Sequence, residues 1–323
     1  MHMRQLGGLW PVSALTLGGG GIGQVWGATT RDEAVATVRA AVDAGITLLD
    51  LAPGYGRGEA EAVVGEAFRG RLPDGVRVTT KCQLGSPAAA DIAPTIRQRL
   101  ERSLATLELP RVDLLFLHSN IVPDDYRFPE ADLQDRFATR WTLYQEHVVP
   151  AFEALREEGL IGAWGITGIG LPATILDALD ATPKPAAVQC ISNCLDSPGD
   201  IRRFPEPPEP RSIIARAVHH GVGVMGIRAV QAGALTDGFD RDMRPGQDLA
   251  DFHRAEPFRA LARRWGVSSA RLAHRYALSM DGVDTVVLGV KNRDELRECL
   301  DAEAEGPLTP TEMKEIEAAC GRA

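Results

Sequence analysis

The apolar residues of this chain fall into short runs that alternate with longer segments in which they recur at helical spacing. Eight of the short runs are bounded by glycine, proline or polar residues, which is typical of strands buried on both faces of a parallel sheet. The predicted strands are Val12–Leu17, Ile46–Asp50, Val76–Lys81, Val112–His118, Ile161–Thr167, Ala186–Cys190, Val222–Ile227 and Thr285–Leu288. Strands separated in this way indicate repeated βα units.

The segments between these strands predict helices, and the first shows the pattern, with Val35, Val38 and Val42 on one face and Gly45 after its end. The predicted helices are Glu33–Ala44, Glu59–Phe68, Ile92–Leu107, Trp141–Glu158, Leu171–Leu179, Ile213–His220, Phe258–Trp265 and Ser269–Met280, with two short ones near Glu295 and Glu312. No shift in composition marks a linker. The chain therefore predicts an α/β fold, a single-domain closed (β/α)8 TIM barrel over residues 1–323 with its active site at the C-terminal ends of the strands.

Two long irregular segments interrupt the pattern, Ser119–Arg140 and Ser192–Pro210. Both follow the end of a predicted strand, so both are expected on the catalytic face of the barrel. Loops of this length in a compact domain are usually functional or disordered. The second segment contains four prolines close together, which favours a stiff, extended connector.

Composition and charge exclude several classes of function. The net charge of −9 and the absence of a Lys/Arg-rich run argue against a nucleic-acid partner. No apolar stretch approaches the roughly 20 residues that a membrane span needs, so we expect a cytoplasmic protein with no membrane association. The five cysteines form no CxxC pair or ligand cluster, and we interpret them as reduced packing residues, with no metal site.

A glycine tract follows the first predicted strand, and Gly18, Gly20 and Gly23 match G-x-G-x-x-G. By itself this motif favours a dinucleotide-binding fold of the Rossmann type. Here the helix starts several residues later, so its N-terminus is not presented to a pyrophosphate as that motif requires. The Rossmann fold is therefore the less favoured alternative.

Polar residues stand at the ends of three neighbouring predicted strands. Asp50 ends the second strand with Tyr55 in the turn beyond it, Lys81 ends the third, and His118 ends the fourth. Taken singly, each is more often structural, as when an Asp caps a turn. Strand ends of one barrel converge on one pocket, however, so the four together predict an active site.

These residues resemble the aldo-keto reductase superfamily of (β/α)8 oxidoreductases, and the resemblance covers nearly the whole chain. DAGITLLDLAPGYG is similar to the family's D-x-G-x-x-x-x-D-T-A-x-x-Y-G signature, with Leu51 where Thr is usual. VTTK and DLLFLH resemble its lysine and histidine strands. Weaker similarities are GLIGAWGIT, AAVQCISN and LGVKNRDELREC, the last resembling the loop and helix that hold the cofactor.

The resemblance implies Tyr55 as general acid, Lys81 and Asp50 as the pair that tunes it, and His118 as the group that orients the substrate carbonyl. The chemistry agrees, because a phenol with a pKa near 10 is a weak acid at pH 7 and an adjacent ammonium lowers that pKa. A neutral or charged imidazole can polarise a carbonyl oxygen by hydrogen bonding. The hydride must come from a nicotinamide, since no side chain supplies one.

The resemblance also implies a cofactor-binding set, with NADPH as the expected cofactor and NAD as a possible one. Lys291 and Arg293 are expected to contact the 2′-phosphate, and Glu295, four residues after Lys291, to pair with it and weaken that preference. Arg228 is placed to reach the pyrophosphate. The full set is Gly19, Gly20, Asp50, Thr167, Gln189, Ile227, Arg228, Ala229, Gly233, Gly289, Lys291, Arg293, Glu295 and Glu298.

Some positions depart from the family pattern. Gly168 replaces an asparagine that contacts the nicotinamide carboxamide, Ile227 replaces an aromatic that stacks on the ring, and Cys299 replaces the Asn after Glu298. These changes leave the four candidate catalytic residues in place and affect only the expected contacts to the cofactor.

The predicted activity is the reduction of a small-molecule aldehyde or ketone to an alcohol, or the reverse. Two alternatives remain open: a sugar dehydrogenase that works in the oxidative direction with NAD(P), and a non-catalytic cofactor-binding subunit similar to potassium-channel β subunits. Loops set specificity in barrels, and nothing in Ser119–Arg140 indicates a substrate. The sequence gives no indication of an oligomeric state.

Overall fold

Eight parallel strands close into a barrel in the computed structural model, which describes residues 1–128, 131–239 and 241–322. Each predicted strand supplies one barrel strand, with ends shifted by a few residues, so the predicted (β/α)8 barrel is confirmed. The strands, in their order around the barrel, are β3 (Leu15–Gly18), β4 (Leu48–Asp50), β5 (Arg77–Cys82), β6 (Val112–Leu117), β9 (Ile161–Thr167), β10 (Ala187–Ile191), β11 (Gly223–Ile227) and β12 (Thr285–Leu288). A closed barrel excludes the Rossmann alternative.

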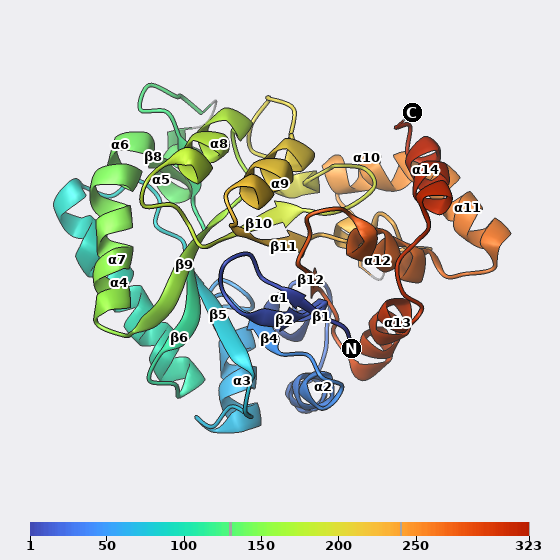
Figure 1. Cartoon of the computed structure of the whole chain (residues 1–323), viewed down its shortest axis with the longest axis horizontal. Coiled ribbons are helices and arrows are strands. Elements are labelled where there is room, and N and C mark those ends of the chain that lie inside the picture. The colour runs from blue at the N-terminus through green and yellow to red at the C-terminus, as the bar shows by residue number, and fades with distance from the viewer. Residues whose placement is uncertain (129–130, 240, 323) are drawn as a thin grey trace.

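Helices surround these strands (Figure 1). Their apolar faces pack against the outside of the barrel in one continuous core. The helices between and after the strands are α2 (Arg31–Asp43), α3 (Glu59–Phe68), α4 (Ala89–Leu107), α7 (Val149–Glu157), α8 (Pro172–Asp180), α9 (Pro210–His219), α11 (Glu256–Trp265), α12 (Ser269–Ser279), α13 (Arg293–Ala304) and α14 (Pro310–Ala319).

Side-chain caps set several helix starts. Thr30, Ser268, Asn292 and Thr309 each accept a hydrogen bond from a backbone N–H three residues on, at the starts of α2, α12, α13 and α14. Such a cap satisfies one of the free N–H groups of the first turn and stabilises a helix by about 1 kcal/mol. The chain therefore encodes these starts locally, in the residue that precedes each helix.

The first predicted strand is divided in the structure. Its beginning forms β2 (Pro11–Ser13), which pairs in antiparallel fashion with β1 (Met3–Gln5), and the barrel strand starts only at Leu15. In Figure 1 this N-terminal hairpin crosses the region of the barrel strands. Leu6 and Val12 are fully buried against inward-facing barrel residues such as Leu48 and Phe116. The hairpin thus closes the N-terminal end of the barrel, opposite the candidate active site.

The two irregular segments differ from each other. Ser119–Arg140 contains β7 (Asn120–Val122) and β8 (Ala138–Arg140), which pair in parallel, and the short helix α5 (Ala131–Phe137); its residues 129 and 130 lie outside the described residues. Ser192–Pro210 has only one turn of 3-10 helix, η2 (Gly199–Ile201), and is otherwise irregular as predicted. Both follow the C-terminal ends of barrel strands.

Other differences are local. The predicted helix Trp141–Glu158 is three segments, α6 (Trp141–Leu143), a π-helical stretch η1 (Tyr144–Val148) and α7. The short helices α1 (Gly19–Ile22) and α10 (Gln247–Arg254) and the turn η3 (Gln231–Gly233) were not predicted. Among the described residues, no helix is long and apolar enough to span a membrane, and no cluster of His, Cys, Asp and Glu could hold a metal. All five cysteines are buried and free.

The N-terminal hairpin predicts a specific stability effect. Leu6 is 0% exposed, so Leu6→Ala should leave a cavity at the end of the barrel and lower the free energy of unfolding by about 2–5 kcal/mol. Met3 lies on the same hairpin and is 52% exposed, so Met3→Ala should change it by no more than about 0.5 kcal/mol. Urea unfolding measures both. Equal, small effects would show that the hairpin is not part of the barrel core.

Candidate active site

A buried ion pair joins the ends of β4 and β5. Lys81 Nζ lies 2.8 Å from Asp50 Oδ2 and donates a second hydrogen bond of 2.8 Å to the main-chain oxygen of Leu51. Asp50 and Lys81 are only 2% and 1% exposed. The other oxygen of Asp50 accepts from Thr79 Oγ1 at 2.7 Å and from Gln189 Nε2 at 2.6 Å. Both carboxylate oxygens are therefore satisfied, as a buried charge requires.

The alternation of β5 explains why Lys81 points inward. Thr79 and Lys81 are two residues apart and face the barrel interior, where both reach Asp50. Thr80 faces the other way and donates to Glu61 of α3 at 2.6 Å. Because β5 pairs with β4 so that Thr79 lies opposite Asp50, the strand register alone brings the lysine to the carboxylate.

Tyr55 lies in the turn that follows β4, with its ring beside the ion pair. Lys81 Nζ is 4.8 Å from the centre of the ring. The ring of His118 meets that of Tyr55 edge-on, with 6.1 Å between centroids and 89° between planes. Gly56 allows the turn, since it has φ of +63° and a Cβ there would lie 2.2 Å from the oxygen of Gly23. The structure thus brings the four predicted side chains together.

The charges of this cluster follow from burial and from its neighbours. Burial raises the pKa of Tyr55, the Lys81 cation lowers it and Asp50 raises it, and the net direction is upward. Burial alone would lower the pKa of Lys81, but Asp50 and Tyr55 outweigh it and raise that pKa. The lysine is therefore charged and the phenol protonated at neutral pH. The expected lowering of the tyrosine pKa by Lys81 exists, but burial exceeds it.

His118 directly follows β6. Its main-chain N–H donates to the main-chain oxygen of Cys82 at 2.8 Å, which continues the hydrogen bonding between β5 and β6. Burial, Lys81 and Arg203 lower the pKa of His118 to about 3. At neutral pH the imidazole is therefore uncharged and keeps one N–H, which can donate a hydrogen bond to a carbonyl oxygen.

Thr167 ends β9, and its hydroxyl is buried without a hydrogen-bond partner among the described residues. Gln189, which like Thr167 belongs to the predicted cofactor-binding set, donates to Asp50. Gly168 has no space for a side chain, because a Cβ there would lie 2.8 Å from the oxygen of Gln189. At this edge of the site the Thr167 hydroxyl therefore has unused hydrogen-bonding capacity.

Two of the predicted glycines pack against Trp26. Gly19 and Gly20 lie in the single turn α1, and a Cβ on Gly20 would lie 2.4 Å from Trp26 Nε1. A Cβ on Gly289 would lie 3.2 Å from the same indole. Packing against Trp26 therefore disfavours a side chain at Gly20 and, less strongly, at Gly289.

Arg228 does not extend freely toward a ligand. It follows Ile227 at the end of β11 with φ of +59°, and its guanidinium donates to Asp248 Oδ1 at 2.6 Å and to Gln231 Oε1 at 2.8 Å. Burial lowers its pKa, with Asp248 opposing. The arginine thereby holds α10 to the barrel, and its contact with a pyrophosphate stays a prediction. Ala229 is buried, and Gly233 ends η3 with φ of +97°.

The predicted phosphate-reading residues lie at the start of α13 and have carboxylate partners. Lys291 pairs with Glu295 at 2.6 Å, as the helical spacing predicted. Arg293 pairs with Glu33 of α2 at 2.8 Å. Asn292 caps α13. Glu298 accepts a hydrogen bond from the hydroxyl of Ser268, so it too is held within the protein.

The sequence did not indicate several partners that the structure reveals. Thr79 could have been found from the sequence, because it lies two residues before Lys81 and therefore on the same face of the strand. Glu33, Asp248 and Arg203 could not, since each meets its partner across a large separation in sequence. Asp248 lies moreover in a helix that the hydrophobic pattern did not predict.

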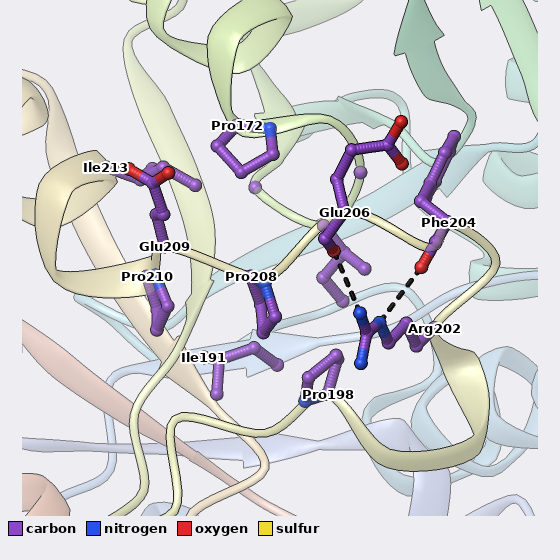
Figure 2. Close-up of a pocket in the computed structure, with 13 residues that line it drawn as sticks. Pro172, Ile191, Pro198, Arg202, Phe204, Glu206, Pro208, Glu209, Pro210 and Ile213 are labelled. Atoms are coloured by element: carbon purple, nitrogen blue, oxygen red, sulfur yellow. Dashed lines mark hydrogen bonds between the residues drawn. The ribbon is translucent and has the colours of Figure 1, made fainter. Parts of the chain in front are cut away.

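Two cavities lie along the Ser192–Pro210 segment. Figure 2 shows the first, where Arg202 donates to the main-chain oxygens of Phe204 and Glu206. Its volume of about 20 Å³ fits roughly one water molecule. The second, about 470 Å³, is large enough for a small ligand. Its lining residues are Leu133, Gly199, Asp200, Arg202, Arg203, Phe204, Pro205 and Gln247.

Comparisons with known proteins agree with this geometry. The model of the Aldo/keto reductase family matches residues 14–320. L-galactose dehydrogenase from Arabidopsis thaliana is 28% identical over 291 residues, 89% of this chain and 83% of that protein. A probable voltage-gated potassium channel subunit beta from Arabidopsis thaliana is 22% identical over 307 residues, 88% of this chain and 86% of that one. Among solved structures, aldo-keto reductase AKR11C1 from Bacillus halodurans (holo form) matches with a TM-score of 0.73 at 23% identity. The match covers 100% of this chain and 97% of the AKR11C1 chain.

The lowered pKa of His118 predicts a pH dependence of stability. Between pH 6.5 and about 3 the unfolded chain protonates this histidine and the folded protein does not, so stability falls as pH falls. His118→Asn should remove this contribution, which is at most about 1.4 kcal/mol per pH unit. His219 is exposed, and His219→Asn should keep the wild-type dependence. Urea unfolding from pH 6.5 to 4.5 tests this, and parallel curves for His118→Asn and wild type would contradict it.

Proposed function

The chain belongs to the aldo/keto reductase family, a family of oxidoreductases, and from this premise we propose that it interconverts a small carbonyl compound and the corresponding alcohol. The observation that carries the proposal is the buried Asp50–Lys81 pair beside the protonated phenol of Tyr55. The uncharged imidazole of His118 meets the same ring edge-on. A proton donor and a neutral hydrogen-bond donor therefore face the same space.

Each residue has a defined part in the reductive direction. A carbonyl that gains a hydride becomes an alkoxide, and Tyr55 transfers its phenolic proton to that oxygen. The phenolate left behind is stabilised by Lys81, whose charge Asp50 maintains. His118 donates a hydrogen bond to the same oxygen as negative charge develops. A bound nicotinamide supplies the hydride.

Thr167 and Gln189, two members of the predicted cofactor-binding set, fit the nicotinamide end of the cofactor. The buried hydroxyl of Thr167 has no partner, and a buried hydroxyl without one costs about 1–3 kcal/mol. A carboxamide of the nicotinamide type would satisfy it. Gln189 fits the same role less directly, because its amide nitrogen already donates to Asp50.

We favour NADPH over NADH, with the basic residues at the start of α13 as the physical reason. Arg293 is 55% exposed in its pair with Glu33, and such surface ion pairs contribute only about 0–1 kcal/mol. A hydrogen bond from an arginine to a phosphate contributes about 1.5–3 kcal/mol. A 2′-phosphate would therefore displace Glu33 from Arg293. Lys291 is less exposed, at 13%, and its pair with Glu295 opposes binding more strongly.

A second candidate function is oxidation of a sugar in the reverse direction, favoured by the similarity to L-galactose dehydrogenase over most of both chains. The same residues serve it, with Tyr55 accepting the proton. The third candidate, a cofactor-binding regulatory subunit, follows from the similarity to the potassium channel subunit. Measurements of turnover, followed by nicotinamide absorbance, distinguish the three functions. A reductase consumes the reduced cofactor with aldehydes, a sugar dehydrogenase produces it with sugars, and a regulatory subunit does neither.

The proton-transfer role predicts the effect of removing one hydroxyl. Tyr55→Phe should lower kcat by at least about 100-fold, the typical loss of a general acid, and leave cofactor affinity almost unchanged. Tyr144 gives a matched control, because its hydroxyl is buried without a hydrogen-bond partner, and Tyr144→Phe should keep kcat near wild type. Steady-state kinetics and cofactor titration measure both, and near-normal turnover by Tyr55→Phe would refute the assignment.

The cofactor preference predicts opposite effects of two substitutions. Arg293→Ala should weaken NADPH binding by about 1–3 kcal/mol and barely change NADH binding. Glu33→Gln should strengthen NADPH binding, because it removes the carboxylate that Arg293 otherwise contacts. Arg297 on the same helix pairs with Asp294, and Arg297→Ala is the control that should change neither. Fluorescence titration measures the affinities. Equal losses for both cofactors, or a wild-type preference for NADH, would contradict the role of Arg293.

A further inference from the structure

Arg203, in the Ser192–Pro210 segment, is a partly buried cation. Its guanidinium carbon lies 3.7 Å from the centre of the Phe137 ring, at the end of α5. Within the described residues no carboxylate pairs with it, although the chain has 44 acidic residues and a net charge of −9. Burial and the nearby Arg136 lower its pKa. A partly desolvated charge that is left unpaired is costly, which points to a ligand of opposite sign.

The position of Arg203 relates it to the candidate active site. Its charge is one of those that lower the pKa of His118. The main chain next to Phe137 is joined to the end of β5, because Gln83 Nε2 donates to the main-chain oxygen of Arg136 at 2.9 Å. Gln83 follows Lys81 by two residues, and it also donates to the hydroxyl of Ser119, directly after His118, at 3.2 Å. The stack of Arg203 on Phe137 is thereby connected to the ends of β5 and β6.

Other charged groups nearby are already engaged. The adjacent Arg202 donates to main-chain oxygens and holds the loop. Lys81 is neutralised by Asp50. Asp200 lines the same cavity as Arg203 but accepts from the N–H of Asp248 at the start of α10. In the part of the chain that the structure describes, Arg203 is therefore not in an ion pair with any of these groups, and Arg136 approaches the exposed Asp132 only to 3.9 Å.

The surroundings of Arg203 suit a small anion. The hollow that it lines is open to solvent and has a volume of about 470 Å³, which leaves room for a small anion. A guanidinium stacked on an aromatic ring keeps its N–H edge free, and that edge matches the two oxygens of a carboxylate or phosphate. The stack with Phe137 also fixes its orientation before a ligand arrives.

We propose that Arg203, assisted by Arg136, binds an anionic group of the substrate, so that the preferred substrate is a carbonyl or alcohol compound that carries a carboxylate or a phosphate. This inference rests on the proposed function. It names the substrate class for the reaction at Tyr55. It also assigns a binding role to a segment whose prolines had indicated only a connector.

Paired substrates test the proposal. Glyceraldehyde 3-phosphate is compared with glyceraldehyde, and succinic semialdehyde with its methyl ester, for wild type, Arg203→Gln and Arg203→Lys. Wild type should prefer at least one anionic member by about tenfold or more in kcat/KM. Arg203→Gln should lose about 10- to 100-fold on that member, chiefly through KM, and little on its neutral counterpart. Arg203→Lys should retain part of the preference for the anionic substrate. Whether wild type prefers glyceraldehyde 3-phosphate or succinic semialdehyde shows whether Arg203 binds a phosphate or a carboxylate.

A matched control and a second readout separate this proposal from the proposed function. Arg127 is exposed and donates to the main-chain oxygen of Tyr126, so Arg127→Gln should match wild type within about twofold. With NADP present, phosphate or succinate should raise the melting temperature of wild type more than that of Arg203→Gln, which needs no turnover. Turnover without an anionic preference overturns the inference alone. Absence of turnover on every substrate overturns the proposed function, and the melting temperatures then still decide whether Arg203 binds anions.

Discussion

The buried ion pair of Asp50 and Lys81 is the constraint on which the site depends. Two charges this deeply buried cost several kcal/mol each unless hydrogen bonds compensate them. Here the compensation comes from three strands, since Thr79 and Lys81 lie on β5, Asp50 on β4 and Gln189 on β10. The bond from Gln189 crosses the interior of the barrel, so Asp50 has all its hydrogen-bond partners only when the barrel is closed. Opening the barrel would leave Asp50 with its partners on β5 alone.

This pair also fixes the charge of everything around it. Lys81 stays protonated because Asp50 is beside it, and the cation in turn helps to keep His118 neutral. Burial keeps Tyr55 protonated against the pull of Lys81. The centre of the site is therefore close to neutral overall, with one proton available on the phenol. Two further cations, Arg203 and Arg136, lie close by on the irregular segments, and we propose that they attract an anionic substrate.

The sequence predicted the features that repeat locally and missed those that depend on distant contacts. Short apolar runs located all eight barrel strands, and polar residues at three strand ends located Asp50, Lys81 and His118. The N-terminal hairpin was missed because Val12–Leu17 is one apolar run, in which nothing marks where β2 gives way to β3. The partners of Gln189, Arg228 and Arg293 were missed because each is tens or hundreds of residues away. Such pairs are set by how the barrel closes, and no local pattern records them.

The same distinction separates chemistry from specificity. The residues proposed to carry the chemistry lie at the ends of β4, β5 and β6 or, like Tyr55, in the turn after β4, and these were readable from the sequence. The residues that would face the remaining part of a substrate lie in the two irregular segments Ser119–Arg140 and Ser192–Pro210. These segments meet where Arg203 stacks on Phe137 and also where Phe204 packs against Tyr126 and Phe128. A cation–π contact contributes about 0.5–2 kcal/mol, so the Arg203–Phe137 stack is only one part of what holds the segments together. An anion bound between Arg203 and Arg136 would remove the repulsion between them and strengthen that contact. Substrate binding would then stabilise one contact between the two segments, while the strand ends that carry the chemistry stay as they are.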